Sequence, residues 1–235
     1  MSLKTTLIDL MPGRLVRVFA APYIAGKGLA LVAYYRFDDG TSATNNGAGA
    51  WTGAEAFGVV PDMVNFAYDY TGDGWPDIIV LGFPGLQSWW FENPQGKPGH
   101  WNRHVAVDVT DNESPTFADI TGDGKPELIF STGGFLGYAS PDPKNPTNKW
   151  TFHKISPKGS WQKFTHGLGV GDVNGDGRAD LLFKDGWFEQ PAKGVTGPWK
   201  WHKTFFAPTS SQMYAYDVNG DGLNDVVTAL ASHGY

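Results

Sequence analysis

Four short apolar runs, each entered through a polar, glycine-containing segment, dominate the pattern of this chain. The runs are Ile78–Val80, Leu128–Phe130, Leu181–Phe183 and Val226–Val227. Short apolar runs bounded by turn residues are typical of buried strands, whereas a helix needs a longer periodic pattern. The 31 glycines and 16 prolines among the 235 residues also favour many turns and few long helices. The pattern therefore predicts an all-β chain.

The polar segment before each apolar run is one nine-residue motif, found at residues 69–77, 119–127, 172–180 and 217–225. Acids occupy positions 1, 5 and 9, Thr or Asn occupies position 3, and glycines occupy positions 4 and 6. Such oxygen side chains suit a hard cation such as Ca²⁺, which takes roughly six to eight oxygen ligands. The glycines let the backbone turn tightly enough to aim these oxygens inward. The motif opens like an EF-hand loop, but its last acid comes earlier, and strand-forming residues follow instead of a helix.

The candidate metal ligands are the side chains at positions 1, 3, 5 and 9 of the four loops. They are Asp69, Thr71, Asp73, Asp77, Asp119, Thr121, Asp123, Glu127, Asp172, Asn174, Asp176, Asp180, Asp217, Asn219, Asp221 and Asp225. Half of the 24 acidic residues lie in these loops. The formal net charge of −6 is therefore interpreted as a consequence of the many candidate metal ligands. The sequence has no basic stripe of the kind that nucleic-acid binding needs, so no nucleic-acid partner is expected.

The loops recur at intervals of 50, 53 and 45 residues, measured between their third positions. Other short motifs, or marks, repeat in phase with the loops. The segment Trp90–Pro94 recurs as Trp187–Pro191 and, with a degenerate sequence, as Gly137–Pro141. Each of these segments is followed by a Trp-x-x-His unit. A period near 50 residues is the length of one four-stranded propeller blade. The repeat therefore predicts a β-propeller of four-stranded blades.

We expect one propeller domain or fragment over residues 1–235, with about five repeats. The N-terminal repeat has a degenerate loop near residues 23–31, in which Lys27 replaces the central Asp and would repel a cation. Residues 37–56 are rich in Gly, Ala and Asn and are expected to form an irregular loop. Few residues follow the last Asp loop. Either the N-terminal strand completes the last blade, or the chain is a piece of a propeller with six to eight blades; we favour the second.

The motif Asp-x-[Asn/Thr]-Gly-Asp-Gly-x-x-[Asp/Glu], in register four times across residues 69–225, resembles the FG-GAP/VCBS repeat family. This family of calcium-loop propellers includes the integrin α-subunit head, and bacterial members with the Trp-Phe-Glu-Asn-Pro and Trp-x-x-His marks are the most similar. The resemblance implies one structural Ca²⁺ per intact loop and a secreted or surface protein, often beside carbohydrate-active or adhesion modules. It does not imply one activity. Thr71, Thr121 and Glu127 depart from the family pattern.

The location is expected to be extracytoplasmic: secreted, periplasmic or at the cell surface. The reason is that a calcium-loaded fold suits compartments where the free ion is plentiful. No signal-peptide region is seen near Met1, so this hypothesis assumes an export signal that is absent from this chain. No apolar run reaches the length of a membrane span.

Candidate ligand residues are those that interrupt the repeat. His166 stands where other repeats have Met63, Glu113 and Ser211, and it would enter an inner strand near the channel mouth. Trp51, Trp75, Trp89 and Trp161 do not repeat in phase and are candidates for a glycan-binding surface, with simple packing as the alternative. By contrast, His104, His153 and His202 recur once per repeat, so a structural role is expected for them.

No catalytic constellation stands out, since the sequence has no Gly-x-Ser-x-Gly, phosphate-binding glycine loop or His-Glu-x-x-His. The predicted function is a non-catalytic binding or scaffold module for carbohydrate or protein. Two alternatives stay open. One is a carbohydrate-active lyase or dehydratase with a metal-assisted site around His166, and the other is a cell-surface adhesion module. The sequence leaves the oligomeric state undetermined.

Overall fold

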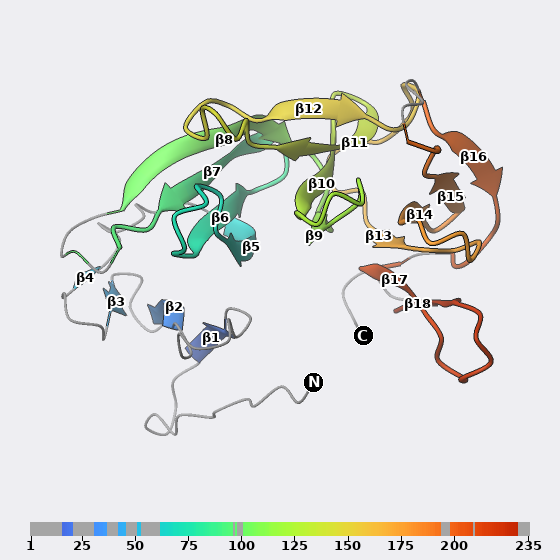
Figure 1. Cartoon of the computed structure of the whole chain (residues 1–235), viewed down its shortest axis with the longest axis horizontal. Coiled ribbons are helices and arrows are strands. Elements are labelled where there is room, and N and C mark those ends of the chain that lie inside the picture. The colour runs from blue at the N-terminus through green and yellow to red at the C-terminus, as the bar shows by residue number, and fades with distance from the viewer. Residues whose placement is uncertain are drawn as a thin grey trace. The chain divides into compact units, whose positions relative to one another are not determined.

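The computed structural model describes residues 16–20, 31–36, 42–45, 51–52, 62–95, 97, 101–193, 198–208 and 210–229 (Figure 1). Within these ranges all the regular elements are β-strands, which confirms the all-β prediction. They include no helix that could cross a membrane. The predicted degenerate loop, with Lys27, lies outside the described residues except for its last position.

The N-terminal sheet has the order β1-β2-β3-β4. Its strands are β1 (Val16–Ala20), β2 (Leu31–Arg36), β3 (Ser42–Asn45) and β4 (Trp51–Thr52). The expectation of an irregular loop over residues 37–56 is therefore wrong in part. β3 pairs antiparallel with β2 through Tyr35 and Ala43, and this pairing overrides the weak strand propensity of a Gly/Ala/Asn-rich segment.

Two further sheets each have four strands in sequence order. One contains β5 (Asp62–Tyr68), β6 (Asp77–Gly82), β7 (Leu86–Glu92) and β8 (Asn102–Thr110). The other contains β9 (Thr116–Ala118), β10 (Glu127–Thr132), β11 (Phe135–Ser140) and β12 (Thr151–Lys154). In both, an Asp loop joins the first strand to the second, as the repeat predicts.

The last sheet has six strands in the order β16-β15-β14-β13-β17-β18. They are β13 (Leu168–Gly171), β14 (Asp180–Phe183), β15 (Gly186–Glu189), β16 (Lys200–Lys203), β17 (Met213–Tyr216) and β18 (Asp225–Thr228). Four strands form one repeat, and β17–β18 begin the next. β13 and β17, the first strands of the two repeats, lie side by side and parallel (Figure 1).

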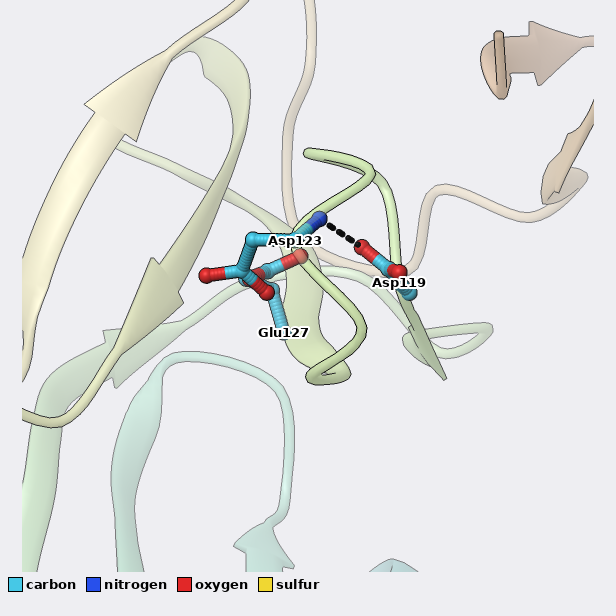
Figure 2. Close-up of side chains that lie close together, drawn as sticks. All are labelled: Asp119, Asp123 and Glu127. Atoms are coloured by element: carbon cyan, nitrogen blue, oxygen red, sulfur yellow. Dashed lines mark hydrogen bonds between the residues drawn. The ribbon is translucent and has the colours of Figure 1, made fainter. Parts of the chain in front are cut away.

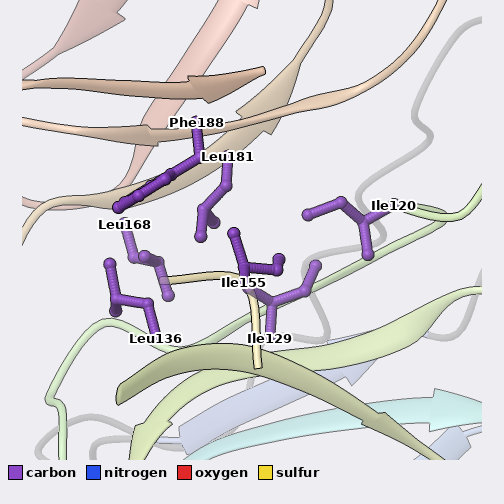
Figure 3. Close-up of a cluster of buried hydrophobic side chains, with 7 residues drawn as sticks. All are labelled: Ile120, Ile129, Leu136, Ile155, Leu168, Leu181 and Phe188. Atoms are coloured by element: carbon purple, nitrogen blue, oxygen red, sulfur yellow. The ribbon is translucent and has the colours of Figure 1, made fainter. Parts of the chain in front are cut away.

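The apolar runs that follow the Asp loops are the most buried strands. All of β6 and β14 and nearly all of β10 are buried. A main core cluster forms between the third and fourth sheets and consists of Ile120, Ile129, Leu136, Ile155, Leu168, Leu181 and Phe188 (Figure 3). The third sheet thus buries apolar side chains against the fourth.

Contacts between residues divide the chain into two compact units. Unit 1 comprises residues 1–60, 67–78 and 91–103, and unit 2 comprises residues 61–66, 79–90 and 104–235. The first Asp loop lies in unit 1, whereas the other three loops and the main core cluster lie in unit 2.

Two glycines allow β13 and β17 to approach closely. A Cβ added at Gly169 would lie 2.0 Å from the carbonyl oxygen of Met213, and one added at Gly171 would lie 2.5 Å from the Cβ of Ala215. Both distances are far below van der Waals contact, and the Met213 atom is backbone. The parallel pairing of the two repeats therefore depends on the absence of a side chain at these positions.

Gly169→Ala should destabilise the fold by about 1–3 kcal/mol, because the new methyl group must push two backbones apart. At this chain length the melting temperature should fall by roughly 2–4 °C per kcal/mol. Thr151→Ala, at an exposed position in β12, is the control for the change in strand propensity. Equal melting temperatures for the two variants would show that the close approach does not stabilise the fold.

Candidate metal loops and a binding pocket

The Asp at position 1 organises each of the four loops. Its Oδ1 accepts hydrogen bonds from the backbone N–H groups at positions 4 and 5, and its Oδ2 accepts one from position 6, at 2.7–3.2 Å. The same three bonds recur at Asp69, Asp119, Asp172 and Asp217. Since a carboxylate has about four lone-pair sites, each Asp keeps acceptor capacity for a cation.

The glycines at positions 4 and 6 have the backbone conformation that this wrapping requires. All eight have φ between 75° and 87°, a left-handed region that other residues rarely adopt. A Cβ at Gly72 or Gly122 would meet nothing within 4 Å, so backbone conformation, not space, explains the glycine. The loops thus turn tightly around the first Asp.

Position 5 is exposed in every loop, and its Oδ1 accepts a hydrogen bond from the backbone N–H at position 7, at 2.8–2.9 Å. At position 3, Asn174 and Asn219 donate to the position 5 carboxylates. Thr71 instead donates to Asp69 Oδ1 at 3.3 Å, and Thr121 donates to Glu127 Oε1 at 3.2 Å. In the third loop the guanidinium of Arg178 also pairs with Asp176. All these donors and acceptors hold oxygen atoms near the centre of the turn.

The acid at position 9 ties the loop to the sheet. One of its oxygens accepts a hydrogen bond from the backbone N–H at position 2, at 2.9–3.1 Å, in all four loops. Asp77, Glu127 and Asp180 are buried, and Asp225 is half-buried. In these three loops, the second strand therefore begins with a carboxylate that is shielded from solvent.

The third strand supplies a second donor to this acid in two repeats. The backbone N–H of Asn93 donates to Asp77 Oδ1 at 2.8 Å, and that of Gln190 donates to Asp180 Oδ1 at 2.9 Å. Sequence reasoning did not assign these residues to the loops. Their signal was present, because both occupy the fourth position of the in-phase Trp-Phe-Glu-[Asn/Gln]-Pro mark.

The second loop is built differently, and the strand register gives the reason. Leu128 pairs with Ala139 as Leu181 pairs with Phe188, so Pro141 occupies the place of Gln190. Pro has no N–H to donate. The degenerate copy of the Trp-Phe-Glu-[Asn/Gln]-Pro motif therefore begins at Tyr138. This start is one residue later than Gly137, the start predicted from the sequence.

Without that donor, the acid of the second loop turns its free oxygen into the loop. Glu127 is one methylene longer than Asp, and its Oε1 accepts the hydroxyl hydrogen of Thr121. Ligand oxygens of Asp119, Asp123 and Glu127 all lie within 4.8 Å of one another (Figure 2). Among the described His, Asp and Glu residues, this is the one group of three that meets so closely. Its all-oxygen donor set fits a hard divalent cation.

Burial shifts the titration of the position 9 acids. It raises the pKa of Asp77 from 3.8 to about 7, against the lowering effect of the Asn93 and Tyr70 N–H groups. It also raises the pKa of Glu127 from 4.5 to about 7, with Asp123 and Asp119 adding repulsion, and it raises the pKa of Asp180. Each acid thus loses more solvation than the surrounding donors replace.

Two of the predicted ligand residues, Trp161 and His166, line one pocket of about 420 Å³. His166 Nε2 lies 2.6 Å from Glu113 Oε2, and the ring of Trp161 meets that of Phe183 edge to face. The other Trp candidates are not among the residues that line this pocket. Trp75 is 43% exposed within the first Asp loop, Trp89 is half-buried in β7, and Trp51 lies in β4 with its side chain outside the described residues.

The three in-phase histidines have the structural role that their repetition predicts. The imidazoles of His104, His153 and His202 stack on aromatic rings of the neighbouring third strands. The ring centroids lie 4.5, 4.9 and 4.0 Å from those of Trp90, Tyr138 and Trp187, respectively. The in-phase Trp residues join successive repeats through their main chain. The backbone N–H of Trp150 donates to Ala106 O, and the backbone N–H of Trp199 donates to Ile155 O.

Comparison with known families identifies the repeat. Residues 69–130, which contain the first two Asp loops, match the model of an FG-GAP-like repeat. This match supports the FG-GAP part of the resemblance. A search of curated proteins found no match to this chain.

Two solved structures are similar to this chain. An Agrocybe aegerita lectin, described as specifically recognising non-reducing terminal N-acetylglucosamine, matches with a TM-score of 0.55 and 19% identity over 92% of this chain and 60% of its own. The V. cholerae biofilm matrix protein Bap1 matches with a TM-score of 0.40 and 20% identity over 70% of this chain and 27% of its own. This chain therefore spans less than two thirds of either protein. The likeness to the lectin is one of fold.

The buried acids generate a pH prediction for the metal-free protein. Asp77 and Glu127 titrate higher in the fold than in the unfolded chain, so the folded state binds more protons between pH 4 and pH 7. Stability should therefore be greatest below about pH 4 for these groups and fall as the pH rises through 7. The expected loss is on the order of 2–4 kcal/mol per acid.

Urea unfolding in chelator at pH 5 and pH 8 measures this loss. Glu127→Gln is the matched variant, because its amide oxygen can still accept the N–H of Ile120 but carries no charge. The variant should lose less stability than the parent between the two pH values. Stability that rises from pH 5 to pH 8 in the metal-free parent would contradict the prediction.

Proposed function

We propose that this protein is a calcium-stabilised β-propeller that acts as a non-catalytic binding or scaffold module, with carbohydrate as its first ligand class. The observation that carries the proposal is the recurrence of one hydrogen-bond scaffold in four loops. In each loop the carboxylate at position 1 is wrapped by backbone N–H groups, the Asp at position 5 is exposed, and the acid at position 9 closes the loop onto the start of the second strand.

Calcium would supply the positive charge that these loops lack. The fit is clearest in the second loop, where Asp119, Asp123 and Glu127 already lie together. A cation there would offset the desolvation of Glu127 and the repulsion from its two neighbours, so metal binding would contribute directly to folding. Recurrence of the loop in every repeat favours a structural ion over a signalling one. An extracytoplasmic location follows, since free calcium is plentiful there.

The propeller itself is supported by the repeat. Meandering antiparallel strands recur with a period near 50 residues, and the first strands β13 and β17 of successive repeats run parallel and adjacent. In a propeller the inner strands of neighbouring blades have this relation around the axis. The FG-GAP-like match over residues 69–130 agrees with this architecture.

Carbohydrate is favoured as ligand by aromatic side chains that remain exposed, since sugar rings stack on such surfaces. Phe164 and Trp75 are both more than two-fifths exposed. The lectin of similar fold recognises N-acetylglucosamine, which makes this sugar the first probe. A protein ligand is the second possibility for the same module. A lyase or dehydratase activity around His166, which pairs with Glu113, is the enzymatic alternative, and it would appear as turnover of the bound sugar.

Removing calcium should lower the melting temperature sharply. At a calcium concentration 100 times the dissociation constant, one site contributes about 2.7 kcal/mol, which at this size corresponds to about 5–10 °C. Thermal melts in chelator and in excess Ca²⁺ measure the difference. Asp123→Asn should reduce the calcium-dependent increment, whereas Asp142→Asn, at an exposed Asp outside the loops, should leave it unchanged. An increment of zero in the parent protein would refute the structural role of calcium.

The binding function is tested by titrating the calcium-loaded protein with methyl glycosides of N-acetylglucosamine, glucose, galactose and mannose. Heat release or a change of tryptophan fluorescence reports binding, and product analysis after long incubation reports turnover. We expect at least one sugar to bind and to be recovered intact. Recovery of a cleaved or dehydrated glycoside would favour the enzyme. The absence of binding to all four sugars would refute carbohydrate as the ligand class.

A further inference from the structure

We propose that the pocket formed by Trp161, Phe164, His166, Phe183, Asp185 and Ser210 binds one uncharged sugar residue at the end of a glycan. This inference rests on the proposed function and assigns its site. The volume of about 420 Å³ falls at the small end of the roughly 300–1,000 Å³ typical of small-molecule sites. That size favours a terminal residue over a long segment of polymer.

Three separate segments of unit 2 form the pocket. Residues 160–166 come from the connection that leads into β13, Phe183–Asp185 end β14 and begin the turn to β15, and Ser210 precedes β17. The strand register places this pocket at one end of β13, where Leu168 pairs with Phe183. The third Asp loop lies at the other end, where Gly171 pairs with Asp180. Binding in the pocket is thus separated from the metal loop.

The connection that carries the aromatic groups is held rigidly. The N–H of Phe164 donates to Asp111 O at 3.0 Å, and the N–H of Glu113 donates to Thr165 O at 3.1 Å. The carboxylate of Glu113 also holds His166 at 2.6 Å. Asp111 is buried and is itself fixed to β10 through Ser131. A site preorganised in this way loses little conformational entropy when it binds a ligand.

Phe164 is the residue that packing alone does not explain. Its φ is 63°, a conformation that is costly for a bulky side chain, yet its side chain is 49% exposed. Its ring meets only the edge of the ring of Phe83, another exposed aromatic, among the described ring pairs. Strained residues held by their surroundings cluster at ligand sites, where the strain positions a group. Here the strain presents an aromatic ring at the pocket.

The polar groups of the pocket suit the hydroxyls of a neutral sugar. Lys184 Nζ is paired with Asp185 Oδ2 at 2.6 Å, and Glu113 is paired with His166, so an ionic ligand would have to break an existing pair. In the lining of the pocket, the Asp185 carboxylate is an acceptor, the Lys184 ammonium is a donor, and Trp161, Phe164 and Phe183 add aromatic rings. Together these groups match the alternating hydroxyls and C–H faces of a pyranose. An anionic or cationic ligand has no such match.

Ser210 provides an independent indication. Its Oγ is buried and, among the described residues, has no hydrogen-bond partner. A buried hydroxyl without a partner is unfavourable in a native protein and needs an explanation. It lies directly against Gly167, where an added Cβ would come within bonding distance of Oγ, so the main chain passes close to this hydroxyl. Because this oxygen is closed to solvent, a small displacement of the surrounding side chains would let a bound sugar hydroxyl reach and satisfy it.

Phe164→Gly is the decisive variant, because glycine adopts positive φ freely. We expect the affinity for the sugar bound by the parent protein to fall by about tenfold or more, since truncating an aromatic anchor removes a binding hot spot. The melting temperature should stay the same or rise, because backbone strain is relieved. If Phe164 served only to pack the fold, the melting temperature would fall. Phe205→Ala, at a Phe that is 71% exposed outside the pocket, is the control and should bind like the parent.

Titration of the calcium-loaded parent and both variants with the four methyl glycosides separates the outcomes. Full affinity in Phe164→Gly, with loss of affinity in Trp75→Ala, would overturn this pocket and leave the proposed carbohydrate-binding function intact. Failure of the parent to bind any of the four sugars would overturn both. If a proline-rich peptide bound the parent but not Phe164→Gly and no sugar bound, the sugar would be refuted and the ligand would be a protein.

Discussion

The structure depends on a carboxylate that is buried where each second strand begins. Asp77 and Asp180 are fully buried, and Glu127 is nearly so. Each accepts the N–H of the second loop residue and so closes the loop against the sheet. The same burial raises the pKa of all three groups. Each loop is therefore closed by a carboxylate whose lost solvation the surrounding N–H groups do not fully replace. A cation bound beside this carboxylate would favour its charged form.

The tight turns of the loops could be predicted from the sequence because their geometry is local. The three N–H groups that wrap Asp172, for example, lie within five residues of it, and the glycines that permit the wrapping are visible in the motif. The orientation of the last acid is not local. Asp180 is held by Gln190, which directly follows the next strand β15, and Glu127 lacks such a donor because Pro141 takes that place. Only the strand register shows that the second loop is the one in which three carboxylates lie close together.

The packing between repeats was partly predictable. In-phase aromatic residues indicated contacts that recur once per repeat. The Trp–His stacks recur in this way within a repeat. The hydrogen bond from the backbone N–H of Trp150 to Ala106 O joins two repeats. The close parallel approach of β13 and β17 was hidden, because Gly169 and Gly171 look like ordinary strand glycines until the neighbouring strand is placed. Strands β3 and β4 were missed because pairing, of β3 with β2 and of β4 with β3, makes that segment extended, whereas its composition does not indicate a strand.

The two ends of the strands are under different constraints. At the loop end, residues 172–180 must keep acids and glycines at fixed positions, which leaves little freedom for a ligand-specific surface. At the other end, the connection into β13 must only reach the next strand, so its residues are free to vary between repeats. Trp161 and His166 interrupt the repeat at that end, and the strained Phe164 lies between them. A fold whose repeated acidic loops lie at one end of the strands can thus carry a pocket that does not repeat at the other end, without either constraint interfering with the other.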